Sequence, residues 1–144
     1  MDSYKTAPFQ TMTKAILSRL EKLARTAAKA SYSPYSQFAV GATVLTGSGK
    51  TYSGTNIENA SFGLCNCAER TAIFTAVAAG EKKIKCVVVY TPTPNVTPPC
   101  GACRQVINEF GPSARIISVC DSKDRLDLSL ETLLPGAFGP GNLG

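Results

Sequence analysis

The chain has 144 residues, of which 44% are hydrophobic and 17% charged, and these values suit one globular domain with one core. The net charge of +5 comes from dispersed lysines and arginines, so we expect a solvated surface and no nucleic-acid partner. Histidine is absent, which excludes every metal site, catalytic triad or general base that needs an imidazole.

The amino-terminal stretch, residues 1–12, carries no helical or strand pattern and is expected to be a flexible arm. It lacks the apolar centre of an export signal, and no hydrophobic run in the chain reaches the length of a membrane span. We therefore expect a cytoplasmic protein without a membrane partner, with residues 1–144 forming a single domain.

The first half of the chain predicts a helix followed by a hairpin. Residues 13–30 place apolar side chains at helical spacing, with Thr13 as a suitable cap. A Ser-Pro-Tyr-Ser turn ends this helix. Residues 38–46 and 51–56 read as two strands joined by a Gly-Ser-Gly-Lys turn, and residues 57–64 read as a loop.

The second half alternates helices and strands, which favours a sheet with helices on both faces. Helices are predicted over residues 68–79 and 101–110, each ended by glycine. The apolar runs 86–90 and 116–120 predict strands buried on both faces. A proline-rich loop, 91–99, lies between them. Residues 126–128 suggest a short strand, 129–133 a short helix, and residues from 135 onward an irregular tail.

Two cysteine motifs at predicted helix starts point to a metal centre. Cys67-Ala68-Glu69 opens one helix, and Cys100 and Cys103 open the next as a Cys-x-x-Cys pair. Free N–H groups at a helix start favour thiolates. Three thiolates can hold zinc and leave one coordination position open, beside which Glu69 can handle protons. This pattern indicates a hydrolytic zinc site with one ion per subunit.

Other roles for the cysteines stay open at this point. Cys65 could supply a fourth thiolate and make the zinc site structural, and a lone Cys-x-x-Cys also occurs in redox proteins. Cys86 and Cys120 lie in predicted buried strands and are expected to be core residues. Three thiolates around a dication leave net negative charge, so a nearby cation should compensate; Arg70 is the first candidate and Arg104 the second.

Five stretches together resemble the zinc-dependent nucleoside and nucleobase deaminase superfamily, most closely the small homotetrameric cytidine deaminases. The stretches are Phe-Ala-Val-Gly-Ala at 38–42, Asn-Ile-Glu-Asn-Ala at 56–60, Cys-Ala-Glu-Arg-Thr-Ala at 67–72, Pro-Cys-Gly-Ala-Cys-Arg-Gln at 99–105 and Leu-Leu-Pro at 133–135. The resemblance implies an α/β fold, namely a three-layer α/β/α sandwich with a mixed central sheet of about five strands. It also implies a homotetramer whose pockets are shared between subunits.

The resemblance also implies roles for individual residues. Cys67, Cys100 and Cys103 correspond to zinc ligands and Glu69 to the proton shuttle, with Arg70 beside the ligands. The substrate-binding positions that it implies are Phe38 against the pyrimidine, Asn56 and Glu58 on the sugar hydroxyls, Ala60, Ala68, and Phe138, which enters a neighbouring subunit's pocket. Phe62 falls in a loop near subunit boundaries.

The expected activity is hydrolytic deamination of cytidine and 2′-deoxycytidine, yielding the uridine product and ammonia, as in pyrimidine salvage. Blasticidin-type deamination of an aminoacyl-nucleoside shares the zinc pattern without requiring the Asn-Ile-Glu-Asn element. Deamination of cytosine within RNA or DNA is a further alternative, but the chain lacks an evident aromatic and basic groove.

Overall fold

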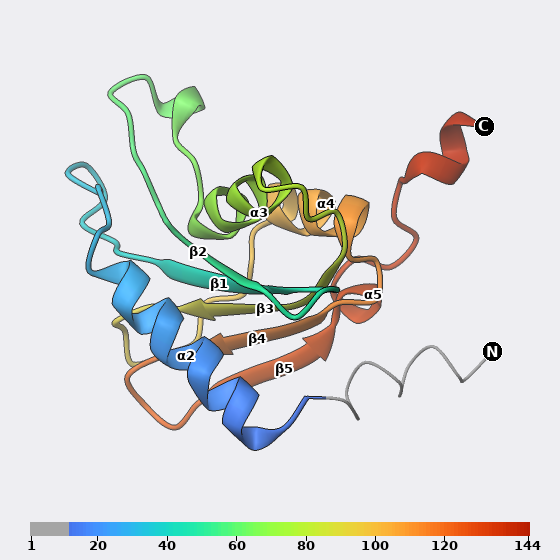
Figure 1. Ribbon diagram of the computed structural model, residues 1–144. Helices are drawn as coiled ribbons and strands as arrows, with labels where there is room; N and C mark the ends of the chain where they lie inside the picture. Colours follow the sequence, from blue (N-terminus) through green and yellow to red (C-terminus); the bar gives the residue numbers. More distant parts are fainter. Residues whose placement is uncertain (1–11) are drawn as a thin grey trace.

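The computed structural model describes residues 12–144 as a five-stranded sheet between two layers of helices (Figure 1). The strand order is β2-β1-β3-β4-β5, formed by Thr51–Thr55, Gly41–Thr46, Ile84–Tyr90, Arg115–Val119 and Arg125–Ser129. The β3–β4 pair is parallel and the other pairs are antiparallel. The predicted mixed sheet and three-layer arrangement are confirmed. Of the predicted flexible arm, residues 1–12, residues 1–11 lie outside the described residues, whereas Met12 is buried in a core cluster with Leu20 and so belongs to the folded body.

Helix α2 (Lys14–Ala28) covers one face of the sheet. Thr13 caps it, because the Thr13 side chain accepts a hydrogen bond from the Ile16 N–H at 3.2 Å. Leu20, Ala24 and Ala28 repeat every four residues and face the sheet. Helix and strand β1 approach so closely at Gly41 that a Cβ there would lie 2.0 Å from the Ala24 carbonyl oxygen.

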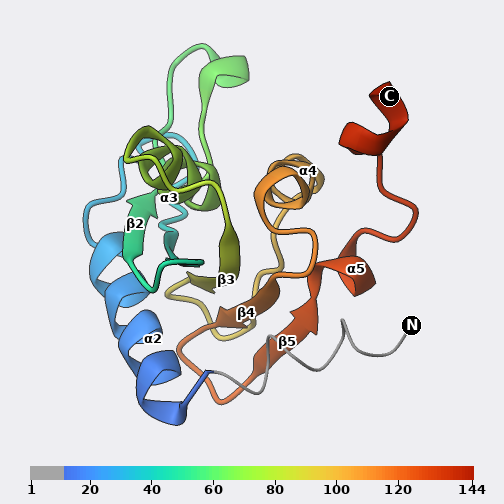
Figure 2. The ribbon, with the colours of Figure 1, turned by 45° about the vertical axis from the view of Figure 1, so that its right-hand side comes forward.

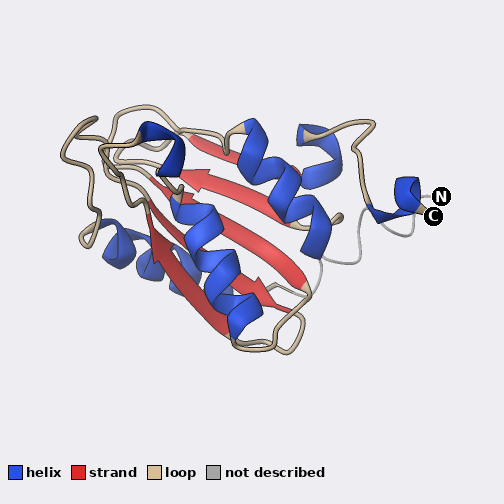
Figure 3. Ribbon diagram, turned by 90° about the horizontal axis from the view of Figure 1, so that it is seen from above, coloured by secondary structure: helices blue, strands red, loops and turns tan. Residues whose placement is uncertain are grey.

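Helices α3 (Ala68–Ala78) and α4 (Gly101–Phe110) lie side by side on the opposite face, as the view from above shows (Figure 3). Helix α3 leads into β3, and β3 leads through the loop 91–99 into α4. Since α3 and α4 flank β3 in this order, both helices begin near the carboxyl-terminal end of β3. That end of a strand is where open α/β sheets place their ligands.

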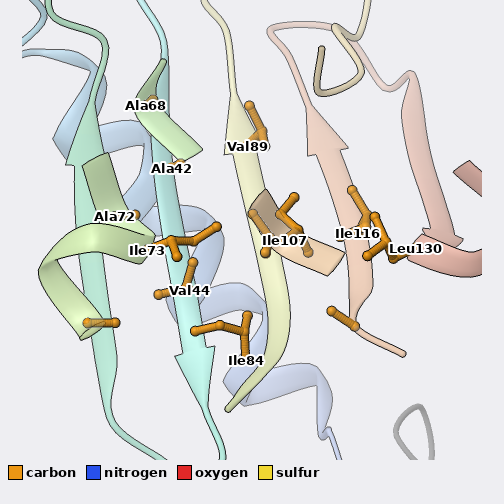
Figure 4. Packing of buried hydrophobic residues seen from close by; sticks show 13 residues of the cluster. Ala42, Val44, Ala68, Ala72, Ile73, Ile84, Val89, Ile107, Ile116 and Leu130 are labelled. Carbon is orange, nitrogen blue, oxygen red and sulfur yellow. The ribbon is translucent and has the colours of Figure 1, made fainter. Parts of the chain in front are cut away.

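The main core lies between the sheet and these two helices. Ile73 of α3 and Ile107 of α4 pack with strand residues such as Val44 and Ile116 (Figure 4). Strand β3 is buried on both faces, as predicted, because its Cys86 and Val88 join Leu20 in a second cluster under α2. Cys86 and Cys120 are both buried, in agreement with their predicted core roles.

Element boundaries differ from the predictions at a few places. The first strand begins at Gly41 and not at residue 38, since the side chain of Asn56 takes the hydrogen bonds of Phe38 and Val40 that a neighbouring strand would take. Strand β3 begins two residues earlier than predicted, at Ile84, and β5 is longer than the predicted 126–128. A 3₁₀ turn over Pro140–Leu143 interrupts the tail that we expected to be irregular.

Two segments stand away from the layered body (Figures 1 and 2). One connects β2 to α3 and includes a 3₁₀ turn over Phe62–Leu64; the other follows the short helix α5 (Leu130–Leu133). Both carry exposed apolar side chains: Phe62 and Leu64 are 71% and 70% exposed, and Phe138 and Leu143 are 57% and 80% exposed. Among the described helices, none combines the length and hydropathy of a bilayer span.

Candidate active site

Three thiols meet where α3 and α4 begin. Cys67 is the cap residue of α3 and Cys100 is that of α4, and neither uses its side chain to cap the helix. Cys103 lies in the first turn of α4. The three Sγ atoms lie within 4.8 Å of one another, and those of Cys67 and Cys100 are 3.9 Å apart. Cys103 is buried, Cys67 half-buried and Cys100 exposed, so the cluster opens toward solvent on the Cys100 side.

This donor set fits one zinc ion. Tetrahedral Zn–S bonds of about 2.3 Å place two sulfurs about 3.8 Å apart, close to the separation of Cys67 and Cys100. Soft thiolates with no other donor type in the cluster favour zinc over harder cations. The thiols are free cysteines, so the cluster holds no disulfide.

The thiol of Cys65 belongs to a different environment. Its Sγ accepts a hydrogen bond from the Asn59 N–H at 3.3 Å and donates to the Asn59 carbonyl at 3.6 Å. It is not a member of the three-thiol cluster among the described residues. The reading of a closed four-thiolate structural site therefore finds no support in this geometry.

Arg70 supplies positive charge to the cluster. Its Nη2 donates a hydrogen bond to Cys67 Sγ at 3.3 Å, and this bond raises the pKa of the guanidinium. The neighbouring Cys103 thiol and then the hydrogen bond from Arg70 lower the pKa of Cys67 to about 5. The Nε of Arg70 is buried and has no partner in the described part of the chain, which leaves a spare N–H beside the thiols. These contacts favour the thiolate that a metal requires.

Arg104, the second candidate for this role, acts elsewhere. Its Nε donates to the Pro99 carbonyl and its Nη1 to the Leu133 carbonyl, both at 2.8 Å. The side chain therefore ties the peptide before Cys100 to the end of α5, and it contributes to positioning the loop that carries two of the thiols.

Glu69 is the buried carboxyl of the site. It lies in the first turn of α3, is 5% exposed, and its Oε2 accepts a hydrogen bond from the Cys103 thiol at 3.7 Å. Loss of hydration raises the pKa of this carboxyl. Because burial favours the protonated form, this carboxyl can hold a proton and pass it on, as a general acid–base catalyst must.

A cavity of about 660 Å³ connects these groups. Its size suits a small molecule rather than a polymer. Cys67, Cys100 and Glu69 lie at one part of its wall. Five of the seven residues predicted to bind the substrate or to move its protons line this cavity, together with Phe62; the five are Phe38, Asn56, Glu58, Ala68 and Glu69. Ala60 and Phe138 do not belong to its lining among the described residues; both are exposed on the protruding segments.

Asn56 is held by the backbone around it. Its Oδ1 accepts hydrogen bonds from the Val40 N–H at 2.9 Å and the Ser31 hydroxyl at 2.5 Å, and its Nδ2 donates to the Phe38 carbonyl at 2.7 Å. The carbonyl oxygen has two lone pairs and the amide nitrogen two hydrogens. Asn56 therefore keeps one free N–H and no free acceptor.

Glu58 is held by a turn whose Ser36 also lines the cavity. Its Oε1 accepts from the N–H groups of Tyr35 and Ser36, at 3.0 and 3.1 Å, and its Oε2 accepts from the Ser36 hydroxyl at 2.5 Å. The Ser36 hydroxyl is the largest cause that lowers the pKa of this carboxyl, so it stays ionised at neutral pH.

Several cavity residues were not predicted. Ser36, Asn66 and Thr97 line the cavity but lie outside the motifs described above, and Val40 lies in the 38–42 stretch without a predicted role. For Ser36 there was a usable signal, since the Ser-Pro-Tyr-Ser turn directly precedes Phe38. For the others only the fold brings them to the cavity.

The chain matches the family model described as the cytidine and deoxycytidylate deaminase zinc-binding region, over residues 15–119. It is 44% identical to a cytidine deaminase of Halalkalibacterium halodurans over 120 residues, covering 83% of this chain and 91% of the relative. It is 43% identical to a cytidine deaminase of Sporosarcina psychrophila over 128 residues, covering 86% and 94%. The crystal structure of a cytidine deaminase from Burkholderia pseudomallei superposes with a TM-score of 0.81 at 44% identity, covering 88% of this chain and all of that one.

Proposed function

The chain belongs to the cytidine and deoxycytidylate deaminase family, and from this premise we propose that it is a zinc-dependent cytidine deaminase. The reaction is hydrolytic deamination of cytidine and 2′-deoxycytidine to uridine and 2′-deoxyuridine, with release of ammonia. The observation that carries the proposal is the cluster of three thiols beside the buried carboxyl of Glu69, on the wall of a nucleoside-sized cavity.

Cys67, Cys100 and Cys103 would hold the zinc, one ion per subunit. When bound, zinc supplies Lewis acidity that lowers the pKa of a coordinated water toward neutrality. Arg70 donates to Cys67 and offsets part of the negative charge of three thiolates, which would otherwise weaken that acidity.

Glu69 moves the protons of the reaction. Deamination replaces an amine at C4 of the pyrimidine by oxygen from water, so one proton must reach N3 and another must reach the leaving amine. Glu69 is buried, and loss of hydration favours its protonated form. The water provides the protons, Glu69 accepts them one after the other, and it delivers them to N3 and to the amine.

The sugar end of the cavity offers one donor and one acceptor. The free N–H of Asn56 can donate to a sugar hydroxyl, and the carboxylate of Glu58 can accept from the same hydroxyl. One hydroxyl satisfies both groups. This supports 2′-deoxycytidine as a substrate beside cytidine, because neither group requires a second hydroxyl.

Phe38 is the aromatic side chain proposed to pack against the pyrimidine, and it lines the cavity. Ala68 completes the wall near the thiols. Phe138 and the loop with Ala60 and Phe62 are proposed to complete the pocket of a neighbouring subunit in a homotetramer. The exposed phenylalanines of both protruding segments support this, because their side chains are free to pack against another subunit. Sedimentation that finds an active monomer would contradict it.

A nucleoside fits the cavity better than a polynucleotide. Among the described residues of the lining, the one cation is Arg70, and it is bonded to a thiol. A strand of nucleic acid needs several cations along its backbone. The presence of Asn56 and Glu58 argues against blasticidin-type substrates, because these two residues suit a free sugar hydroxyl. A single catalytic domain, cytoplasmic residence and a role in pyrimidine salvage complete the proposal.

The test is an ultraviolet assay of cytidine and 2′-deoxycytidine with the purified protein, before and after chelation and after zinc is restored. We expect conversion of both, loss on chelation and recovery with zinc. Ammonia release from polynucleotide or blasticidin but not from free cytidine would replace the proposal, and full activity without metal would refute it.

A further inference from the structure

The hydroxyl of Ser36 connects the turn at residues 33–38 to the sugar end of the cavity. Ser36 Oγ donates to Glu58 Oε2 at 2.5 Å and accepts from the Phe38 N–H at 3.1 Å. One side chain therefore touches both the carboxylate and the backbone of the aromatic residue proposed to contact the two ends of the nucleoside. Glu58 and Phe38 line the same cavity as Ser36.

The hydrogen bonds fix how many acceptors Glu58 has left. Each carboxylate oxygen has two lone pairs. Oε1 accepts from two backbone N–H groups, those of Tyr35 and Ser36, and Oε2 accepts from the Ser36 hydroxyl. One lone pair, on Oε2, remains. A carboxylate with three bonds cannot rotate freely, so the remaining acceptor has a fixed direction.

The turn itself adopts a backbone shape that few residues accept. Gln37 has φ of 55°, in the left-handed region, and its N–H donates to the Ser33 carbonyl at 2.9 Å. Such a conformation persists where its surroundings determine it, and it is common next to binding sites. Here Ser36 precedes Gln37 and Phe38 follows it. The bonds of Ser36 to Glu58 and to the Phe38 N–H therefore fix both neighbours of Gln37.

We propose that Ser36 is a positioning residue for sugar recognition, which restricts Glu58 to one free acceptor aimed at a single sugar hydroxyl. The inference rests on the proposed function. In this role Ser36 does not contact the substrate and acts through Glu58. Its loss should weaken the binding of nucleosides that carry this hydroxyl and leave the proton chemistry at Glu69 unchanged.

The test compares Ser36→Ala with the wild type on two ligands. The KM for cytidine should rise about tenfold with kcat unchanged, the effect expected for one hydrogen bond to a charged group. The inhibition constant of 2′,3′-dideoxycytidine, measured as a competitive inhibitor of cytidine turnover, should stay the same, since that ligand lacks the 2′- and 3′-hydroxyls, one of which is the proposed partner of Glu58. Ser36→Thr keeps the hydroxyl and should keep the wild-type KM.

Two further variants complete the design. Ser48→Ala removes a hydroxyl that also donates to a carboxylate, that of Glu81, but neither residue lines the cavity, so the KM should stay unchanged. In a Glu58→Ala background, adding Ser36→Ala should change the KM no further. If Ser36→Ala does not fold, Ser36→Cys, a much weaker donor of similar size, replaces it.

The inference is overturned if Ser36→Ala binds cytidine normally, if the KM for cytidine and the inhibition constant rise by the same factor, or if its effect persists without Glu58. These results would leave the proposed function intact. A wild type that does not deaminate cytidine would overturn both.

Discussion

Replacing Gly54 by alanine should displace the helix on which the catalytic carboxyl lies. Gly54 is in β2, under α3, and a Cβ at this position would meet the Ala72 nitrogen at 2.4 Å and the Ala68 carbonyl oxygen at 2.7 Å. Ordinary van der Waals contact begins near 3.4 Å, so α3 must move by about 1 Å. Both obstructing atoms belong to helix backbone, which cannot rotate away as a side chain can.

Two magnitudes follow from that displacement. Overpacking of this kind costs about 1–3 kcal/mol, which for a chain of this length lowers Tm by roughly 3–10 °C. Cys67 and Glu69 lie at the start of the same helix, and a shift of 1 Å at a catalytic group costs about 100-fold in rate. We expect kcat/KM for cytidine to fall by about that factor.

The assay combines steady-state kinetics, thermal unfolding and zinc content for Gly54→Ala. Gly141→Ala is the matched control, because the added Cβ has nothing within 4 Å and the backbone there is not left-handed. A Gly54→Ala protein with the Tm and kcat/KM of the wild type would refute the close packing of α3 on β2 as the element that positions the site.

Three further predictions concern single side chains. Glu69→Gln should lower kcat by at least about 100-fold with zinc content unchanged, since it removes proton transfer and leaves the thiols in place; retained turnover would exclude the shuttle role. Cys65→Ser should keep full zinc content and activity, because its thiol bonds to Asn59 and not to the cluster; loss of zinc would make it a ligand. Burial raises the pKa of Cys86 to about 12 from 9.0, so the unfolded chain ionises first as the pH rises. The free energy of unfolding should fall by about 1.4 kcal/mol per pH unit above pH 9, measured by urea unfolding; an equal slope in Cys86→Ala would contradict this.

The layers of the fold could be predicted because their signals are local. Apolar spacing in residues 13–30 and 101–110 reports the buried side of a helix, and the continuous run at 86–90 reports a strand covered on both faces. The position of Gly41 as the true start of β1 was not predictable in this way. It depends on Asn56, which is distant in sequence and replaces a strand partner with its own side chain.

The candidate site likewise has a part that local sequence patterns predict and a part that only the fold reveals. The spacing of the cysteines predicts the metal cluster, because few residue types can bind a metal. The resemblance added Glu58 and Asn56 to the predicted site. The role inferred for Ser36 depends on a contact with a residue 22 positions away, and the hydroxyl of a serine in a turn has no distinctive pattern. Similarly, that Cys65 turns toward Asn59 became visible only in three dimensions.

The three sulfurs come from the beginnings of two helices that have a whole strand between them in the chain. A partly folded chain therefore binds the ion weakly at most, and tight binding follows only after both helices have packed on the sheet. Zinc retention therefore reports whether both helices are packed in place. Variants that fold with loosened helices should release their zinc to a colorimetric chelator long before they lose helical circular dichroism.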